Sequence, residues 1–169
     1  MVMNAYRVAM TLNVGDPIPS VDLFVMGAAG PEKVNTADVL GSGKVVLFAV
    51  PGAFTPGCSK VHLPGFVQQA SELTGKGVDR IACLSVNDAF VMGAWGDDQQ
   101  VGDSITMLAD GNGEFTQAMG LVMDGTGFGL GVRSKRYAAI IENGVITNID
   151  VDENGGVEVS PCSAVIGRL

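Results

Sequence analysis

The chain has 169 residues, of which 47% are hydrophobic and 17% are charged. This composition excludes an intrinsically disordered protein, and the length favours one domain spanning residues 1–169 with a substantial core. Ten basic and eighteen acidic residues give a formal net charge of −8, which excludes an electrostatic footprint for nucleic acid or an anionic membrane.

Membrane and targeting signals are weak in this sequence. No apolar run approaches the roughly 20 residues that a membrane-spanning helix needs. Residues 1–13, a short extension with little structural information, lack the apolar core of a signal peptide and the Arg- and Ser-rich bias of a transit peptide. Three cysteines without a Cys-x-x-Cys pair argue against a disulfide scaffold and fit a reducing compartment. We therefore expect a cytoplasmic protein.

In the first third of the chain, turn residues separate short apolar segments. Residues 21–26 predict an edge strand, followed by a turn over 27–32. Thr36 is expected to cap a short helix that ends at Leu40. The apolar run over 45–50 predicts a buried strand.

The remaining elements alternate between helices and strands. A helix follows Cys58, and Pro64 should kink it. Strands are predicted over 80–86 and 105–108, a helix capped by Asn87-Asp88 lies between them, and further helices are predicted over 114–121 and 163–169, with a Gly-rich loop over 125–131. Strands over 136–142 and 145–151 flank Asn143-Gly144, a strong hairpin signal. This order predicts one α/β domain with a mixed sheet.

The stretch from Pro51 to Phe66 indicates chemistry. It reads Pro-Gly-Ala-Phe-Thr-Pro-Gly-Cys-Ser-Lys-Val-His-Leu-Pro-Gly-Phe. Two Pro and two Gly within seven residues force a turn after the buried strand, and a helical apolar period begins beyond Cys58. Cys58 therefore lies where a loop meets the start of a helix. Free N–H groups and the helix dipole stabilise a thiolate there, and the thiolate is the nucleophilic form of cysteine.

The pattern Pro51-x-x-x-Thr55-x-x-Cys58 after an apolar strand resembles the peroxidatic motif of peroxiredoxins. Its extension to Phe66 is similar to the type II, or plant-type, branch, as are segments 85–92 and 133–138. The resemblance implies a thioredoxin-like fold, an α/β domain whose mixed central sheet is flanked by helices. It also implies an antioxidant enzyme, a thiol-dependent peroxidase that reduces hydrogen peroxide and alkyl hydroperoxides through a sulfenic acid on Cys58.

Attack on a peroxide needs a thiolate, a donor that holds the peroxide and a cation for the charge on the leaving oxygen. A turn can bring the Thr55 hydroxyl beside the sulfur, and an ordinary capping role fits the same position. Arg133 and Arg136 are both suitable cations; they lie three apart, so in a strand they face opposite ways. The resemblance implies that Thr55 hydrogen-bonds the peroxide, Pro51 shields the thiolate and Arg136 is the catalytic arginine. Arg133 could equally be a solvated surface residue.

Other ligand sites find little support in the sequence. His62, the only histidine, lies four residues after Cys58 and on the same helix face. A protease-like dyad or a metal site would need further members that are not evident, so we interpret His62 as local support or packing. The Gly-rich loop over 125–131 follows a helix and precedes a strand, the reverse of a dinucleotide site. We expect no metal and no cofactor.

Cys83 and Cys162 are the candidate resolving cysteines. Cys83 lies 25 residues after Cys58, a spacing similar to the cysteine pair of plant-type members, but it falls in a predicted interior strand. Cys162 does not align with the C-terminal resolving cysteine of some members. A disulfide needs Cα atoms roughly 4.4–6.8 Å apart, so Cys58 would reach Cys83 only if its helix start unwound. We expect an external reductant, glutathione/glutaredoxin or thioredoxin, with an internal Cys58–Cys83 bond as the alternative.

Two other functions and the oligomeric state complete the expectations. A redox sensor would use Cys58 without turnover, and a thiol–disulfide oxidoreductase would need Cys-x-x-Cys where this chain has Thr55-Pro-Gly-Cys58. The type II branch pairs through loops around its active site. Phe54, Phe128 and Leu130 are apolar residues in Gly-rich loops, so we expect a homodimer, unless these side chains pack within the monomer.

Overall fold

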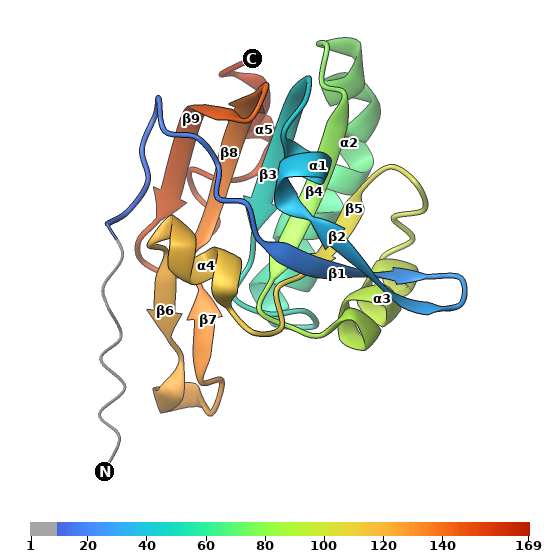
Figure 1. Ribbon diagram of the computed structural model, residues 1–169, viewed down its shortest axis with the longest axis vertical. Coiled ribbons are helices and arrows are strands. Elements are labelled where there is room, and N and C mark those ends of the chain that lie inside the picture. Colours follow the sequence, from blue (N-terminus) through green and yellow to red (C-terminus); the bar gives the residue numbers. More distant parts are fainter. Residues whose placement is uncertain (1–9) are drawn as a thin grey trace.

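In the computed structural model, which describes residues 10–169, a mixed seven-stranded sheet forms the centre of the molecule (Figure 1). Its strands lie in the order β2-β1-β5-β4-β3-β8-β9. Their bounds are Asp22–Gly27 for β1, Gly30–Asn35 for β2, Lys44–Ala49 for β3, Arg80–Ser85 for β4, Thr106–Ala109 for β5, Arg136–Glu142 for β8 and Val145–Asp152 for β9. Strands β3, β4 and β5 run parallel and the other pairs antiparallel, which confirms the predicted mixed sheet.

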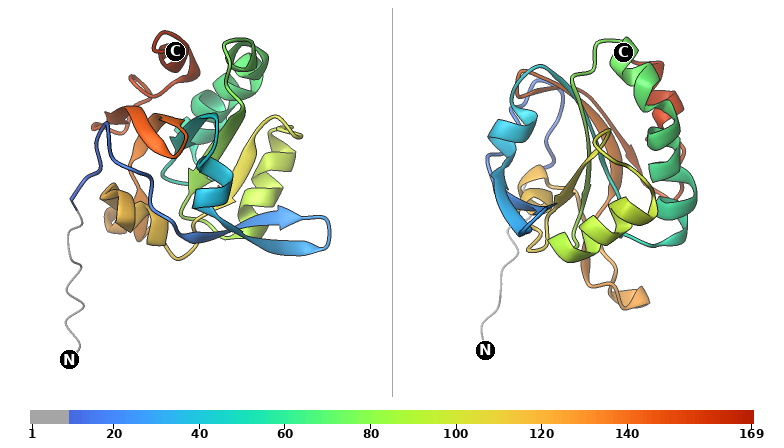
Figure 2. Two further views of the ribbon diagram at one scale, coloured as in Figure 1. Left: turned by 45° about the horizontal axis from the view of Figure 1, so that its top comes forward. Right: turned by 90° about the vertical axis from the view of Figure 1, so that its right-hand side faces the viewer.

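Helices cover both faces of this sheet (Figure 2). Helices α2, α3 and α5 pack on one face, and α1 and α4 pack on the other. Their bounds are Thr36–Leu40 for α1, Leu63–Gly75 for α2, Ala89–Asp98 for α3, Glu114–Met119 for α4 and Cys162–Ile166 for α5. No described helix is long and apolar enough to cross a membrane.

Side-chain alternation in the central strands gives the molecule two separate cores. In β3, Val46 and Phe48 pack beneath α2, whereas Val45 and Leu47 point to the opposite face. Strand β8 follows the same rule, with Ala138 in the core beneath α2. Successive residues of a strand point to opposite faces, so a residue two positions from Ala138 points the same way. The start of β8 therefore faces the layer that holds α2.

The strand predicted over 21–26 is confirmed as β1, but its expected position at the sheet edge and the length of the following turn were wrong. Strand β1 lies inside the sheet between β2 and β5, and the turn shrinks to residues 28–29 because β2 already begins at Gly30. Pro31, Glu32 and Lys33 in β2 are exposed, which hid this strand from a reading based on apolar residues. Polar residues and proline are typical of sheet edges, where they discourage pairing with other chains.

Two local features also differ from the sequence expectations. The flanks of the predicted loop over 125–131 pair as a small separate hairpin, β6 (Val122–Asp124) with β7 (Val132–Ser134), and the 3₁₀ turn η2 (Thr126–Phe128) lies at its tip. Helix α1 is capped by the Asn35 side chain, which accepts from the Ala37 N–H. The Thr36 hydroxyl instead donates to the Pro19 carbonyl and accepts from the Val21 N–H.

The sequence predicted that Pro64 interrupts and kinks the helix after Cys58; the structure shows a change of helix type just before Pro64. Residues 58–62 form the π-helical turn η1 (Cys58–His62), and α2 begins directly after it with Pro64 in its first turn. Proline has no N–H to donate to the preceding turn, which explains why the hydrogen-bonding pattern changes here. The Leu63 N–H closes η1 by donating to the carbonyl of Cys58. A π-helical turn at this point widens the helix around the cysteine.

Candidate active site

The turn between β3 and the cysteine is held in an unusual backbone conformation. Phe54 has a φ of 63°, a region that side-chain-bearing residues rarely adopt. The Thr55 N–H donates to the Gly52 carbonyl at 3.4 Å, and the Ser59 N–H donates to the Thr55 carbonyl at 2.9 Å. The turn thus leads directly into helical backbone that begins at Pro56, two residues before Cys58. Backbone conformations of this kind concentrate at functional sites.

Asn87 anchors this turn to the end of β4. Its side-chain oxygen accepts from the Ala53 N–H at 3.0 Å and from the Ser85 hydroxyl at 2.6 Å. The cap of α3 is therefore Asp88 alone, whose carboxylate accepts from the Val91 N–H at 2.8 Å. The sequence predicted a shared cap and missed the contact with the turn, because that contact joins residues 34 positions apart.

Cys58 and Arg136 meet in the interior of the protein. The sulfur lies in the first helical turn and is fully buried, and Arg136, the first residue of β8, is 5% exposed. Nη2 of Arg136 donates to Sγ of Cys58 at 3.3 Å. A guanidinium at this distance stabilises negative charge on the sulfur in an environment from which water is excluded.

His62 holds the other side of the same guanidinium. Nη1 of Arg136 donates to Nδ1 of His62 at 2.9 Å, and Nε2 of His62 lies 3.0 Å from the carbonyl oxygen of Ser160. A guanidinium can only donate and a carbonyl can only accept, so the ring is neutral and carries its proton on Nε2. Burial lowers the pKa of His62 to about 4, and the Arg136 charge acts in the same direction, against the opposing effects of the Ser160 carbonyl and Asp152. The sequence predicted that His62 supports the site locally or packs in the core, and the structure shows that the group it contacts is the guanidinium of Arg136.

The Thr55 hydroxyl lies in the turn three residues before Cys58 and donates to the Gly52 carbonyl at 2.7 Å. Its remaining lone pairs can accept from a bound molecule. Pro51 contributes its carbonyl, which accepts from Nη1 of Arg133 at 3.4 Å. The turn therefore holds Thr55 at the helix start, where its carbonyl accepts from the Ser59 N–H, and Pro51 lies against Arg133.

Arg133 has a different environment from Arg136. It belongs to β7, not to β8, and is half buried, so it is not a solvated surface residue. Its Nε donates to the Leu130 carbonyl at 2.9 Å and its Nη1 reaches Pro51. A Cβ on Gly52 would lie only 3.0 Å from the same Nη1. Arg133 thus ties the loop over 125–131 to the active-site turn.

The three cysteines are free and buried. Cys83 lies in β4 opposite Phe48 of β3, and burial raises the pKa of its thiol well above the ordinary value, with the nearby Cys58 adding to the effect. Cys162 begins α5, and burial together with the charge of Glu72 raises the pKa of its thiol to about 12. Thiols held in the neutral form are poor nucleophiles, so neither is activated in this conformation.

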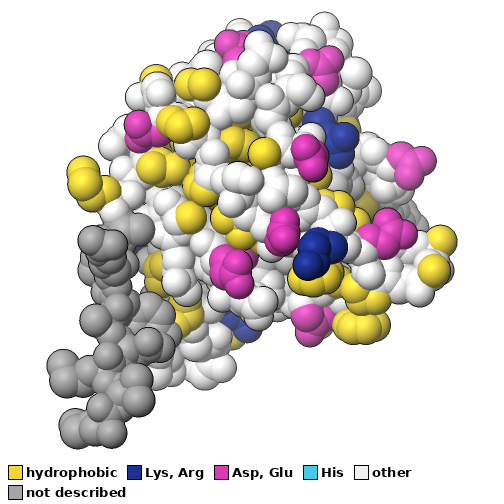
Figure 3. Space-filling view, viewed as in Figure 1, with side chains coloured by type: hydrophobic (Ala, Val, Ile, Leu, Met, Phe, Trp, Pro, Cys, Tyr) yellow, Lys and Arg dark blue, Asp and Glu magenta, His cyan; other side chains and the backbone are white. Residues whose placement is uncertain are grey.

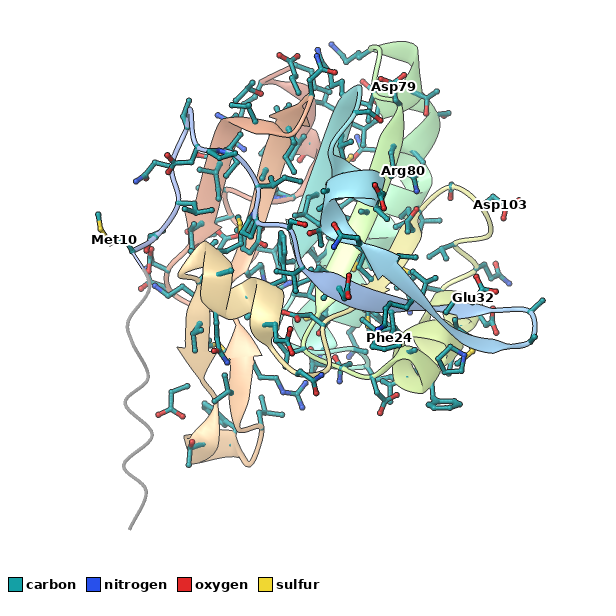
Figure 4. The ribbon with its side chains drawn as sticks, in the orientation of Figure 1. Met10, Phe24, Glu32, Asp79, Arg80 and Asp103 are labelled. Atoms are coloured by element: carbon teal, nitrogen blue, oxygen red, sulfur yellow. The ribbon has the colours of Figure 1, made fainter. Side chains whose placement is uncertain are left out.

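A large surface groove does not open onto Cys58 or Arg136, and the charged side chains do not mark the site. A groove of about 710 Å³ runs between α2 and β4 and is lined by Asp79, Arg80 and Asp103 (Figure 4). Neither Cys58 nor Arg136 lines it. Acidic side chains are scattered over the face shown in Figure 3 instead of gathering in one patch. Within residues 10–169, no group of three or more His, Cys, Asp or Glu side chains could hold a metal ion.

Known proteins share this fold and resemble the chain over most of its length. The Redoxin family model matches residues 13–166. Peroxiredoxin-2E-2, chloroplastic, of Oryza sativa is 46% identical over 170 residues, which cover 98% of this chain and 76% of the relative. Peroxiredoxin-2E, chloroplastic, of Arabidopsis thaliana is 48% identical over 166 residues, which cover 96% and 71%. The crystal structure of reduced Prx3 in complex with H₂O₂ from Vibrio vulnificus superposes with a TM-score of 0.89 at 47% identity, covering 94% of this chain and 99% of that one.

The chain therefore belongs to the Redoxin family and, within it, to the type II (plant-type) peroxiredoxins with a thioredoxin-like fold. Peroxiredoxins are thiol peroxidases, so the predicted fold, enzyme class and peroxide reduction are confirmed. The expected cytoplasmic location was wrong, because both plant relatives are chloroplastic proteins. Free thiols indicate a reducing environment, and the cytoplasm is not the only compartment that provides one.

Because His62 is buried as a neutral ring, the free energy of unfolding should depend on pH. The ordinary histidine pKa is 6.5, whereas the buried ring has a pKa of about 4, so between these values the unfolded chain binds more protons. The free energy of unfolding should therefore fall as the pH falls, by about 3 kcal/mol in total, with most of the loss complete at pH 4. Urea denaturation at several pH values across this range gives the free energy of unfolding of the parent and of His62→Gln. The slope of this free energy against pH should be steeper for the parent. Identical slopes would contradict a neutral buried ring.

Proposed function

We propose that Cys58 is the nucleophile of this thiol peroxidase. Its thiolate attacks one peroxide oxygen, a sulfur–oxygen bond forms and the oxygen–oxygen bond breaks. The second oxygen leaves as hydroxide or alkoxide and takes up a proton, and Cys58 becomes a sulfenic acid. The observation that carries this assignment is the 3.3 Å contact between Nη2 of Arg136 and a fully buried sulfur. The complex of a relative with H₂O₂ supports the same substrate class.

Arg136 is proposed to stabilise charge before and during this reaction. It stays charged at any physiological pH and presents donors in a fixed fork. Nη2 donates to the sulfur of Cys58, and Nη1 donates to Nδ1 of His62. As the oxygen–oxygen bond stretches, negative charge moves from the sulfur to the leaving oxygen. A cation already aimed at the sulfur can follow that charge without reorganising.

Thr55 and Pro51 are proposed to hold the peroxide and to exclude water. The Thr55 hydroxyl donates to Gly52, so its oxygen can accept a hydrogen bond from the O–H of a peroxide. The Pro51 ring lies at the end of β3, and its carbonyl is occupied by Arg133. A proline offers no N–H to recruit water at this point.

Variants of three residues test the assignment. Cys58→Ser should abolish peroxide consumption, because a hydroxyl is far less ionised than a thiol at neutral pH. Arg136→Ala should reduce the second-order rate constant with peroxide by about 10²–10³-fold, the range for a lost charge-stabilising donor. Arg133→Ala is the matched control and should cost less, since it only braces the turn. Stopped-flow peroxide consumption measures all three, and circular dichroism checks their folding.

Two results would contradict these roles. Turnover by Cys58→Ser above a few per cent of the parent would mean that another group reacts. A larger loss in Arg133→Ala than in Arg136→Ala would mean that the stabilising cation is Arg133.

We further infer that an external thiol, glutathione/glutaredoxin or thioredoxin, reduces the sulfenic acid. Cys83 is fixed inside the sheet by its pairing with β3, and Cys162 is packed at the start of α5. Neither can approach Cys58 without rearrangement of the helix start or of a sheet strand. A small thiol or a glutaredoxin can meet Cys58 once the first helical turn opens.

Thiol counting distinguishes external from internal resolution. One equivalent of peroxide should remove one titratable thiol, and mass spectrometry should find a glutathione adduct on Cys58 when glutathione is present. Parallel turnover assays with glutathione/glutaredoxin and with thioredoxin then identify the preferred reductant. Loss of two thiols without an adduct would point to an internal bond, and Cys83→Ser and Cys162→Ser would show which cysteine forms it.

A homodimer is the proposed assembly. Phe54 is 54% exposed and Phe128 is 89% exposed, and both lie on loops beside the active-site turn or tied to it by Arg133. Phe90, on α3, is a further exposed aromatic, 67% accessible. Leu130, in contrast, is half buried and packs against Gly125. Large exposed aromatic side chains near one site are typical of a protein–protein contact.

Light scattering of the reduced protein at micromolar concentration tests the dimer. We expect twice the mass of one chain, and we expect Phe128→Asp to shift the population towards the monomer because it places a charge in the contact. Val14→Asp, at an exposed position far from the active-site turn in the sequence, is the control. A monomer mass for the parent protein would refute the proposal.

A further inference from the structure

The loop over residues 153–161 joins β9 to α5, which are labelled in Figure 1. It touches the candidate active site through the Ser160 carbonyl, although it lies about a hundred residues beyond Cys58 in the chain. We propose that Asp152 folds this loop so that the Ser160 carbonyl fixes the proton of His62 on Nε2, and that His62 thereby holds Arg136 on the sulfur. Asp152 and Ser160 are then positioning residues for the peroxidase reaction. The inference rests on the proposed roles of Cys58 and Arg136.

Asp152 organises the loop through four hydrogen bonds. Its Oδ1 accepts from the N–H groups of Glu158 and Val159, both at 2.9 Å. Its Oδ2 accepts from the Ser160 N–H at 3.2 Å and from the Ser160 hydroxyl. Burial opposes ionisation of this carboxyl, but the bonds from Ser160, Val159 and Glu158 outweigh it and lower its pKa. One carboxylate therefore fixes three consecutive peptide groups, and so fixes the direction of the Ser160 carbonyl that follows them.

The Ser160 carbonyl decides which nitrogen of His62 carries the proton. A neutral imidazole can place its proton on either ring nitrogen. With the carbonyl in place, Nε2 donates and Nδ1 is left as an acceptor for Nη1 of Arg136. Without the carbonyl, the proton could move to Nδ1, and a ring N–H would then face a guanidinium N–H. Two donors cannot bond to each other, so the guanidinium would turn away.

Arg136 has few other restraints on its orientation. Its Nε is buried without a hydrogen-bond partner, so its two terminal nitrogens alone, one on His62 and one on Cys58, orient the group within the described structure. A loss of the His62 acceptor would leave the sulfur as its sole partner. The position of the guanidinium relative to the sulfur thus depends on the tautomer of one ring.

The same loop touches the site at a second point. A Cβ on Gly57 would lie 3.1 Å from Nη2 of Arg136 and 4.0 Å from Cγ2 of Val157, so Val157 of the loop and the guanidinium both lie next to Gly57, the residue before Cys58. From the outside, Arg168 donates to the Val159 carbonyl at 2.7 Å and pairs with Asp150 at 3.1 Å. These contacts fix the loop over 153–161 next to the candidate active site.

The test combines kinetics with nitrogen NMR of the one histidine. Because the chain holds a single histidine, a long-range ¹H–¹⁵N spectrum shows one imidazole and needs no assignment by mutation. The parent should show the pattern of a neutral ring protonated on Nε2. Asp152→Asn should shift this pattern towards a mixture of tautomers and lower the second-order rate constant with peroxide about 10–100-fold, the scale expected for a slightly misplaced catalytic group. Ser160→Ala, which removes only the hydroxyl bond to Asp152, should do the same to a smaller degree and serves if Asp152→Asn folds poorly.

Two controls separate positioning from general destabilisation. Glu153→Ala removes the neighbouring acid, which is exposed and pairs with Lys135, and should leave both the spectrum and the rate unchanged. In a His62→Gln background, Asp152→Asn should have almost no further effect on rate, because its influence passes through the ring.

Three outcomes would overturn the proposal. They are an unchanged tautomer in Asp152→Asn together with an unchanged rate, a slower rate with an unchanged tautomer, and an additive loss in the His62→Gln background. Each applies while Arg136→Ala still slows the reaction. If Arg136→Ala has no effect either, the proposed function of the site has failed instead, and the two failures are thus distinguishable.

Discussion

A buried guanidinium is the feature on which this active site depends. Arg136 is almost inaccessible to water, and in the described structure its hydrogen-bond partners are a neutral imidazole and a sulfur, with no carboxylate in contact. A buried charge without an opposite charge costs several kcal/mol, so the protein needs an anion nearby. Within the described structure, Sγ of Cys58 at 3.3 Å and the carboxyl of Asp152, the residue paired with Arg136 in β9, are the groups nearby that can carry negative charge. The proposed reaction uses this arrangement, because a thiolate on Cys58 and the guanidinium of Arg136 would stabilise each other.

The sheet topology explains how these groups meet. Strand β8 is antiparallel to β3, with Tyr137 paired with Ala49, so the start of β8 lies at the same edge as the end of β3. Strand β4 is parallel to β3 and ends there too, which brings Asn87 to the turn. Strand β9 pairs Asp152 directly with Arg136. The ends of four strands thus bring Cys58, Arg136, Asn87 and Asp152 to one edge of the sheet.

The sequence was sufficient for features that depend on local patterns. The apolar run before Pro51 and the helical period after Cys58 placed the cysteine at a helix start, and Asn143-Gly144 marked the hairpin, where both residues have positive φ. Strand β2 was missed because an exposed edge strand carries few apolar residues. Periodicity alone could not choose between Arg133 and Arg136, since the break at Lys135 that puts them in separate strands has no local signal. The Ser160 carbonyl could not be predicted at all, because a backbone atom carries no sequence signature and its partner, His62, lies 98 residues away.

The helical segment that begins with Cys58 has two parts with different hydrogen-bonding patterns, η1 and α2. Residues 58–62 are wound with wider hydrogen bonds than α2, and Pro64 donates no bond back into them. A disturbance that opens the cysteine end of the helix therefore meets a break in the hydrogen-bond ladder before it reaches the long, well-packed segment over 66–73. The core beneath α2, including the stacked rings of Phe48 and Phe66, can remain in place while the cysteine end moves. Cys58 therefore lies on a short π-helical turn that is separated by Pro64 from the well-packed part of α2, so the two parts are not joined by a continuous α-helical hydrogen-bond ladder.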